Sequence, residues 1–182
     1  MSLTAQQIQA GTGCTAARAQ AWQPYLHPAC VLFSIDSPKR LAAFLAQIGH
    51  ESGRLVYVRE LWGPTAAQTR YEGRVDLGNI YPGDGKRFMG RGLIQTTGRA
   101  NYRATRDGLF AFLMDVPDFE ASPADLEQPE WAALSAAWYW YDRKLNALAD
   151  VGDFKTITLR INGGLNGYPD RLALYEAALK AL

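Results

Sequence analysis

The chain has 182 residues, enough for one ordinary domain with a single hydrophobic core. Hydrophobic residues make up 48% of it and charged residues 20%, close to globular averages, which argues against an intrinsically disordered chain. The net charge of +1 lacks the basic excess on which nucleic-acid binding rests, so we expect no nucleic-acid partner. We interpret residues 1–182 as one domain.

The first residues, 1–13, carry neither a basic segment nor an apolar run, so no secretory signal peptide is predicted. No stretch approaches the roughly 20 apolar residues that a membrane-spanning helix needs. We therefore expect synthesis as a soluble cytoplasmic protein. If the substrate lies outside the membrane, we expect a separate membrane-permeabilising protein to release the chain.

Helical patterns open the chain. Thr4 is expected to cap a helix through Ala10, and a second helix is predicted over 15–25. Ser37-Pro38 is a strong helix start, because a capping hydroxyl is followed by proline in the first turn. We expect this third helix to end near residues 52–53. Its apolar residues recur at helical spacing and define one face: Leu41, Phe44, Leu45 and Ile48.

Residues 54–92 have a different texture. Many glycines and poor alternation predict a long ordered loop or a small irregular sheet, with a short β-branched and aromatic run at 55–58. Unpatterned stretches of this length inside compact domains are usually functional or disordered. The aromatic residues of this stretch favour order: Trp62, Tyr71, Tyr81 and Phe88.

The helical pattern returns after Gly92, with Thr97 as the expected cap of a further helix. A long helix with a wide apolar face is predicted over 131–145. Its aromatic run 138–141 fits the buried stripe, so we interpret it as core rather than as a platform for sugar. Two more helices are expected, over 154–161 and 170–182.

Glu51 is the first candidate for chemistry. The apolar face that begins after Pro38 continues to position 51 or 52, so Glu51 lies at the helix end and at the margin of the buried face. Loss of hydration there disfavours the charged form, which is how a glutamate is kept protonated as a general acid. An ordinary acid at a frayed helix end is the alternative. His50 is a candidate to orient this carboxyl, or else a hydrogen-bonded helix residue.

Cleavage of a glycosidic bond usually takes two carboxyl groups, one to protonate the leaving oxygen and one to orient water or attack. A loop can fold back over a cleft beside the helix end, so the irregular stretch is a suitable place for the second group. The residues alone do not choose among its four candidates: Glu60, Glu72, Asp76 and Asp84.

The segment 90–98, Gly-Arg-Gly-Leu-Ile-Gln-Thr-Thr-Gly, places neutral hydrogen-bonding side chains beside glycines. Such groups suit the hydroxyl and acetamido groups of sugars. A Walker loop is excluded, because Ile80 stands where its first glycine would fall. We expect no metal and no cofactor, because two histidines do not make a zinc ligand set. Cys14 and Cys30 are expected to be reduced and buried, with a disulfide as the alternative.

Four segments occur in a characteristic order and spacing: 44–52 (FLAQIGHES), 90–95 (GRGLIQ), 101–102 (NY) and 161–164 (INGG). Together they resemble glycoside hydrolase family 19, the chitinase family that also contains many phage and prophage endolysins. The link from Trp62 to Asn79 is similar to the bacterial and phage branch. The resemblance implies a mostly α, lysozyme-like α+β fold with a cleft and an irregular or β-containing region around 54–92.

The resemblance also assigns roles. Glu51 matches the family's general acid, and Arg171 is similar to an arginine of the last helix that supports the acidic site. Plant chitinases place the base in a longer, cysteine-containing loop that is absent here. Shorter phage relatives have an acid soon after the first, which Glu60 fits best and Glu72 next. Further positions match residues that line the sugar cleft: Gln95, Thr97, Asn101 and Asn162.

The activity implied is inverting hydrolysis of a β-1,4-linked amino-sugar polymer, with Glu51 as acid and Glu60 as base. We expect the polysaccharide to be peptidoglycan, cleaved by an endolysin-type lysozyme activity of a monomer, because no export signal is predicted and the linker is phage-like. The alternatives are a chitinase acting on chitin oligomers, an inactive carbohydrate-binding protein on the same scaffold, and an enzyme like a goose-type lysozyme or lytic transglycosylase.

Overall fold

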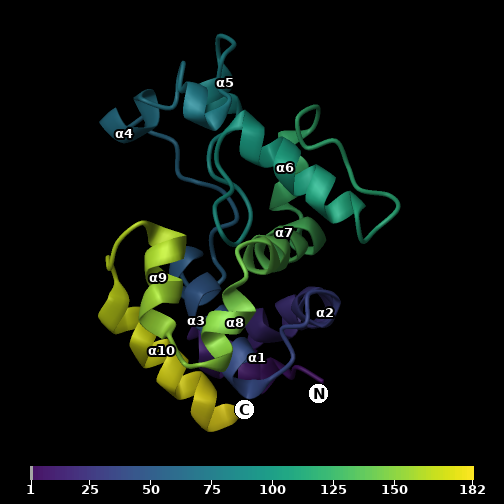
Figure 1. The fold of residues 1–182 in the computed structure, drawn as a ribbon, viewed down its shortest axis with the longest axis vertical. Coiled ribbons are helices and arrows are strands. Elements are labelled where there is room, and N and C mark those ends of the chain that lie inside the picture. Colours follow the sequence, from purple (N-terminus) through teal and green to yellow (C-terminus); the bar gives the residue numbers. More distant parts are fainter. Residues whose placement is uncertain (1) are drawn as a thin grey trace.

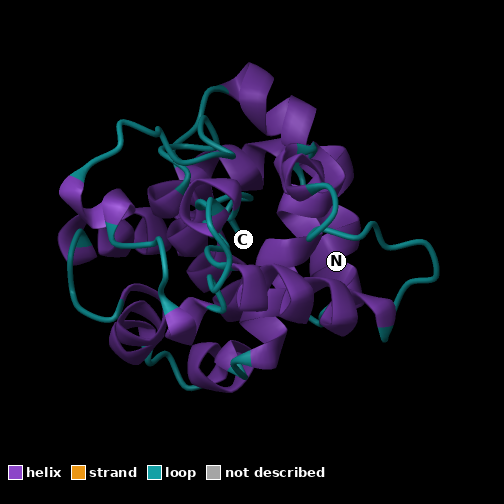
Figure 2. Cartoon of the chain, turned by 90° about the horizontal axis from the view of Figure 1, so that it is seen from above, coloured by secondary structure: helices purple, strands orange, loops and turns teal. Residues whose placement is uncertain are grey.

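The computed structural model describes residues 2–182, which fold mostly into helices joined by loops (Figure 2). Within these residues no named strand occurs, and extended pairing is limited to isolated bridges of Arg91 with Arg59 and Thr96. The predicted mostly α, lysozyme-like fold is confirmed, with its β part reduced to these bridges. The first helices are α1 (Ala5–Thr12), α2 (Ala16–Leu32), α3 (Pro38–Glu51), α4 (Ala66–Thr69), the 3₁₀-helix η1 (Val75–Leu77) and α5 (Asp84–Arg87). The later ones are α6 (Arg99–Phe110), the 3₁₀-helix η2 (Pro123–Glu127), α7 (Pro129–Asp142), α8 (Leu145–Asp150), α9 (Phe154–Asn162) and α10 (Tyr168–Ala181).

The helices form two groups along the long axis of the molecule. Figure 1 shows α4, α5 and α6 at one end and α1, α3, α8, α9 and α10 at the other, with α7 between them. Helix α3 packs against α1, α8, α9 and α10, and α7 packs against both α2 and α6. Among the described residues, no helix is both long and apolar enough to cross a membrane.

Helix α3 begins and ends where the sequence predicts. The Ser37 hydroxyl accepts a hydrogen bond from the Arg40 amide, and Pro38 occupies the first turn. The expected single apolar face is wrong, however, because every residue from Leu41 to Gly49 is buried. A helix that is surrounded by other helices is buried on all sides. This central position fixes the direction in which its last residues point.

The second predicted helix is longer than expected. Instead of ending at Tyr25, α2 continues to Leu32 and passes through Pro24 and Pro28. Each proline removes a helical N–H donor, but α2 also packs against α1 and α7, which supports it through tertiary contacts. Cys14 and Cys30 are both free and buried, which confirms the reduced thiols. Burial raises the pKa of the Cys30 thiol.

Several other boundaries differ from the sequence prediction. The single helix expected over 131–145 is split into α7 and α8 at Lys144, which has a φ of +54°. The run 55–58 is not a strand, and Leu55 has a φ of +60°. Helix α6 is capped by Gly98 rather than by Thr97, and α10 begins at Tyr168. These breaks depend on left-handed residues that apolar periodicity does not reveal.

We predict that Gly49→Ala destabilises the fold. A Cβ at this position of α3 would lie 2.6 Å from the Thr12 Cα of α1, closer than real Cβ contacts come. Overpacking costs about 1–3 kcal/mol, whereas alanine gains about 1 kcal/mol over glycine inside a helix. We therefore expect a net loss of up to about 2 kcal/mol in urea unfolding. Gly164→Ala is the control, because a Cβ there meets nothing within 4 Å; equal losses in both variants would contradict the prediction.

Candidate active site

Glu51 is the last residue of α3, and its side chain is 21% exposed. Its Oε1 accepts a 2.5 Å hydrogen bond from Nη2 of Arg171, which lies in the first turn of α10 and is 1% exposed. The apolar spacing of α3 predicted only loss of hydration at Glu51, and the family resemblance predicted an arginine in support; the structure places the buried Arg171 guanidinium against this carboxyl group. Glu51 is therefore held in one orientation by a charge-assisted contact.

The Arg171 guanidinium is shared among several acceptors. Its Nη1 donates to Oε1 of Gln47 at 2.5 Å, and its Nε donates to the Asn166 carbonyl at 3.3 Å. Gln47 is fully buried in α3 and donates in turn to the Thr158 hydroxyl of α9 at 2.8 Å. This chain of hydrogen bonds joins α3, α9 and α10 behind Glu51. Buried polar groups need such partners, so the chain fixes the three helices relative to one another.

A second polar cluster lies beside the first. The Asp170 carboxylate faces His50 Nδ1 at 2.6 Å and both terminal nitrogens of Arg54, at 2.5 and 3.1 Å. The hydrogen bonds from Arg54, with a smaller contribution from His50, lower the pKa of Asp170 to about 2. His50 is thus turned toward Asp170 of α10, and its hydrogen bond to α10 fixes the end of α3 that carries Glu51.

Three of the predicted sugar-binding residues line one cavity of about 300 Å³: Gln95, Thr97 and Asn101. Gln95 has a φ of +57° and donates its amide to the Gly92 carbonyl at 3.0 Å. The Thr97 hydroxyl donates to the Gln95 carbonyl, and the Asn101 amide donates to the Thr97 carbonyl. Other lining residues come from α6, α7 and α9, among them Thr105, Trp138, Tyr139, Asp142, Arg143 and Ile161.

Tyr139 connects this cavity with Glu51. Burial raises the pKa of its phenol, the Arg143 guanidinium opposes that rise, and the charge of Glu51 adds to it. Glu51 is therefore close enough for its charge to act on a residue of the cavity wall. Glu51 and the cavity that Tyr139 lines are therefore candidate parts of one site.

Asn162 and Arg171, the remaining predicted binding residues, lie in different surroundings. The Asn162 amide nitrogen is buried and has no hydrogen-bond partner within residues 2–182. It belongs to the last turn of α9, beside Ile161 of the cavity wall. An unpaired buried donor is costly, and a binding site is one place where it is retained. Arg171 is too deeply buried to serve as an exposed sugar ligand, and it contacts Glu51 instead.

Glu60, the predicted base, is partly buried in the loop after α3. Its Oε1 accepts from the Gln68 amide at 3.0 Å and the Tyr71 hydroxyl at 3.3 Å, and its Oε2 accepts from the Gly90 amide at 3.1 Å. Burial raises the pKa of Tyr71, and the charge of Glu60 raises it further, so this phenol remains a donor. Glu60 also lines a cavity of about 440 Å³ with Trp62.

The other three acids of this stretch have structural partners. Both oxygens of Glu72 accept backbone amides, from Gly83 at 2.6 Å and Gly85 at 2.8 Å. Asp84 is 2% exposed and binds Arg99, whose hydrogen bonds lower the pKa of Asp84. Asp76 is exposed and pairs with Arg74. Glu60 also has hydrogen-bond partners, but it alone of the four lines a described cavity, which favours it over the other acids.

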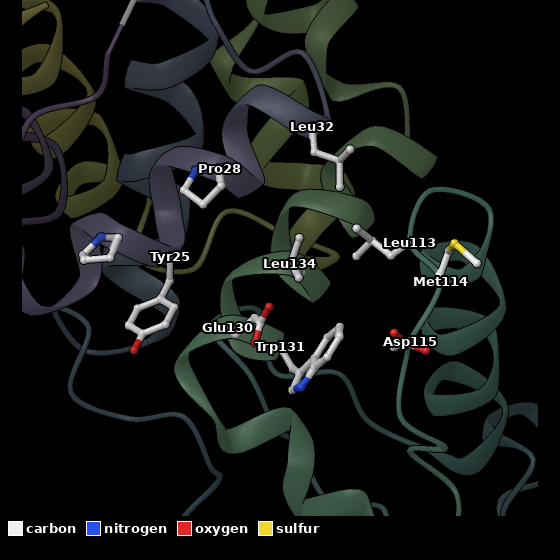
Figure 3. A pocket seen from close by; sticks show the side chains of 10 residues that line it. Tyr25, Pro28, Leu32, Leu113, Met114, Asp115, Glu130, Trp131 and Leu134 are labelled. Atoms are coloured by element: carbon white, nitrogen blue, oxygen red, sulfur yellow. The ribbon is translucent and has the colours of Figure 1, made fainter.

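A larger cavity lies elsewhere. It has a volume of about 760 Å³ and is bounded by α2, α7 and the loop after α6, and Figure 3 shows Tyr25 and Trp131 among its lining side chains. Its lining is mainly apolar, and Asp115 and Glu130 are its acidic members. None of the predicted site residues lines it, whereas three of them line the smaller polar cavity. Among residues 2–182 no group of three metal-ligating side chains comes together.

Sequence reasoning missed the contribution of α7 to this site. The interpretation of 138–141 as core is confirmed for Trp140, which is 1% exposed, and is wrong for Tyr141, which is 47% exposed. Trp138 and Tyr139 are partly buried and line the cavity. Their spacing matches the apolar stripe of α7, so the sequence does not distinguish these two residues from core residues. Gly108 of α6 lies against the Trp138 indole, where no Cβ would fit. The sequence does offer a signal for the buried partner of Arg171, because Gln47 is a polar residue among apolar ones.

Comparison with known proteins finds relatives among glycosyl hydrolases and chitinases. A protein of Haemophilus influenzae, named as a glycosyl hydrolase family 19 domain-containing protein, is 35% identical over 166 residues, covering 76% of this chain and 78% of that protein. An endochitinase of Arabidopsis thaliana is 32% identical over 158 residues, covering 85% of this chain and 51% of its own. A second Arabidopsis endochitinase is 35% identical over 127 residues, with 69% and 40% covered. The chain spans about half or less of these plant relatives. No protein-family model matches it.

A helical fold with a polar cavity beside a partly buried acid, together with these relatives, defines the class: the chain is a glycoside hydrolase. Within that class it belongs to glycosyl hydrolase family 19 and is chitinase-like. The family resemblance drawn from the four sequence segments is thereby confirmed. Polysaccharide substrates follow from this membership.

We predict that Asp170→Asn lowers stability in a pH-dependent way. The folded-state pKa of Asp170, about 2, lies below the unfolded value of about 3.9, so its stabilisation is complete above that value and is lost as the pH falls toward 2. The side chain is 43% exposed, and after allowing for solvent screening we expect a loss of about 1 kcal/mol at pH 7. Urea unfolding at pH 7 and pH 2 measures this.

The difference between wild type and Asp170→Asn should be much smaller at pH 2 than at pH 7. Asp36→Asn is the control, because Asp36 is 60% exposed and makes one 3.4 Å contact with Arg40. A difference that persists unchanged at pH 2 would show that the variant acts through packing instead of charge.

Proposed function

We propose that this chain hydrolyses the glycan strand of peptidoglycan as an endolysin-type enzyme with lysozyme activity. The observation that carries the proposal is the orientation of Glu51 by buried Arg171, next to a cavity lined with neutral hydrogen-bonding side chains. Amide and hydroxyl groups can bind the hydroxyl and acetamido groups of amino sugars without a charge. The bacterial relative matches this chain over most of its length, and peptidoglycan is the amino-sugar polymer of bacterial walls.

In the mechanism that we propose, the Glu51 carboxylic acid donates its proton to the glycosidic oxygen as the C–O bond breaks. Glu60 takes a proton from a water molecule on the opposite face of the sugar, and that water bonds to the anomeric carbon with inversion. Thr97 is placed to help hold this water, and Gln95, Asn101 and Asn162 bind the sugar. Arg171 acts through Glu51 as a positioning residue.

Hydrolysis of chitin oligomers is the second candidate function. The plant relatives are named endochitinases, and chitin has the same β-1,4 linkage between amino sugars. Mass spectrometry of digests separates the two candidates, because it reports which polymer is cut, at which bond, and whether the product carries a hydrolysed or an anhydro end. An anhydro product from peptidoglycan would identify a lytic transglycosylase instead of a hydrolase.

We predict that Glu51→Gln abolishes clearing of purified peptidoglycan. A glutamine cannot protonate the leaving oxygen, and loss of a general acid costs about 10²–10⁴-fold in rate. Turbidity decrease of a wall suspension gives the rate, and thermal unfolding shows that the variant is folded. Glu176→Gln of α10 is the matched control, since this glutamate is exposed on the same helix as Arg171. A wild type that clears nothing, or a Glu51→Gln variant that clears at the wild-type rate, would refute the proposal.

We also predict that Glu60→Gln reduces the rate by at least about 100-fold while Glu72→Gln retains more than about half of it. Glutamine keeps one acceptor oxygen at each position, so both loops retain part of their hydrogen bonding. The reverse order of losses would make Glu72 the base. Equal rates in wild type, Glu60→Gln and Glu72→Gln would show that neither carboxylate acts as the base.

A further inference from the structure

A charged pair stands in the wall of the otherwise neutral cavity. Asp142, the last residue of α7, and Arg143, which caps that helix, line the cavity together with Gln95, Thr97 and Asn101. An uncharged N-acetylated sugar can be bound by neutral donors and acceptors. The pair therefore offers charges that a neutral polymer such as chitin does not require.

The Arg143 side chain is held in place without being covered. Its guanidinium lies 3.7 Å from the centre of the Tyr139 ring, and the side chain remains 38% exposed. The Arg143 carbonyl accepts a hydrogen bond from Arg160 of α9 at 3.1 Å, which fixes the backbone at this position. Stacking on an aromatic ring restricts a guanidinium while its edge stays free to bind.

Most of the hydrogen-bonding capacity of Arg143 is unused by its ion pair. Its contact with Asp142 is 3.5 Å long and involves one nitrogen. By comparison, Arg40 donates to Asp150 through two nitrogens at 2.7 Å each, and Arg99 donates to Asp84 through two nitrogens at 2.5 and 2.9 Å. A guanidinium has five N–H donors, and a planar carboxylate accepts two of them side by side. Arg143 is therefore suited to a carboxylate supplied by a ligand.

Arg143 stacks on Tyr139, and both residues line the cavity that holds Gln95, Thr97 and Asn101. A ligand group bound at Arg143 would thus belong to the part of the substrate that occupies this cavity. The two candidate polymers differ in the groups they would present there. In peptidoglycan the alternate sugars carry a lactyl ether bearing a short peptide with free carboxylates and amines, whereas chitin carries none of these.

Resting on the proposed function, we propose that Arg143 is a specificity residue that binds a carboxylate of the peptide substituent of peptidoglycan. Asp142, which is 53% exposed beside it, faces the ammonium group that such a peptide also carries. Recognition of this charged substituent makes the enzyme prefer peptidoglycan to chitin.

The test compares native peptidoglycan with the same material after its carboxylates have been converted to neutral amides by carbodiimide coupling with methylamine. For Arg143→Gln we expect KM on native peptidoglycan to rise about tenfold with kcat little changed, the pattern of lost uniform binding. On the amidated material we expect wild type and variant to agree within about twofold, because the partner of the guanidinium is gone. Arg143→Lys keeps the charge and should fall between the two.

Arg74→Gln is the matched control. It removes one exposed guanidinium from another close Arg–Asp pair, outside this cavity, and so reports loss of general attraction to an anionic wall. Equal effects of Arg74→Gln and Arg143→Gln, or equal losses on native and amidated material, would overturn the inference. So would an unchanged KM in a variant whose thermal unfolding matches wild type. A wild type inactive on native peptidoglycan would instead overturn the proposed function itself.

Discussion

The organisation of the site depends on one buried cation. Arg171 is almost fully enclosed, and a charge in that position is tolerated only with close polar partners. Glu51 and Gln47 supply those partners from α3, and Gln47 is in turn bonded to Thr158 of α9. The contact that orients the acid is therefore the same contact that satisfies a buried charge in the core. Removal of Glu51 would leave the charge of Arg171 uncompensated, and removal of Arg171 would leave the charge of Glu51 uncompensated.

The two candidate carboxylates are supported in different ways. Glu51 is tied to the packed group of α3, α9 and α10 through Arg171. Glu60 accepts hydrogen bonds from Gln68, Tyr71 and Gly90. These residues belong to the loop-rich segment that carries α4 and α5, at one end of the molecule (Figure 1). Residues 52–65 connect the helices that hold Glu51 with the loop region that holds Glu60. A neutral polar cavity with α6 and α7 in its walls completes the arrangement.

Much of this could be predicted from the sequence where local rules decide. The cap and proline at 37–38 determine where α3 begins, and apolar spacing from there places Glu51 at its end. Gln95, Thr97 and Asn101 are neighbours in the chain, so their shared cavity needs no long-range information. What could not be predicted depends on tertiary contacts between distant residues. The continuation of α2 through two prolines, the burial of Gln47, and the roles of Tyr139 and Arg143 all arise from helices that meet far apart in sequence.

The sharing of Arg171 among three helices has a consequence for inactivation by heat. Glu51 does not lose its orientation while the rest of the fold stays intact, because Arg171, which orients it, is part of the core. Most residues between 56 and 78, the segment that carries Glu60, are exposed, so this segment belongs to the less stable part of the chain. On gradual warming, Glu60 should lose its alignment before Glu51 does, and activity should decline at temperatures where helical structure is still largely complete.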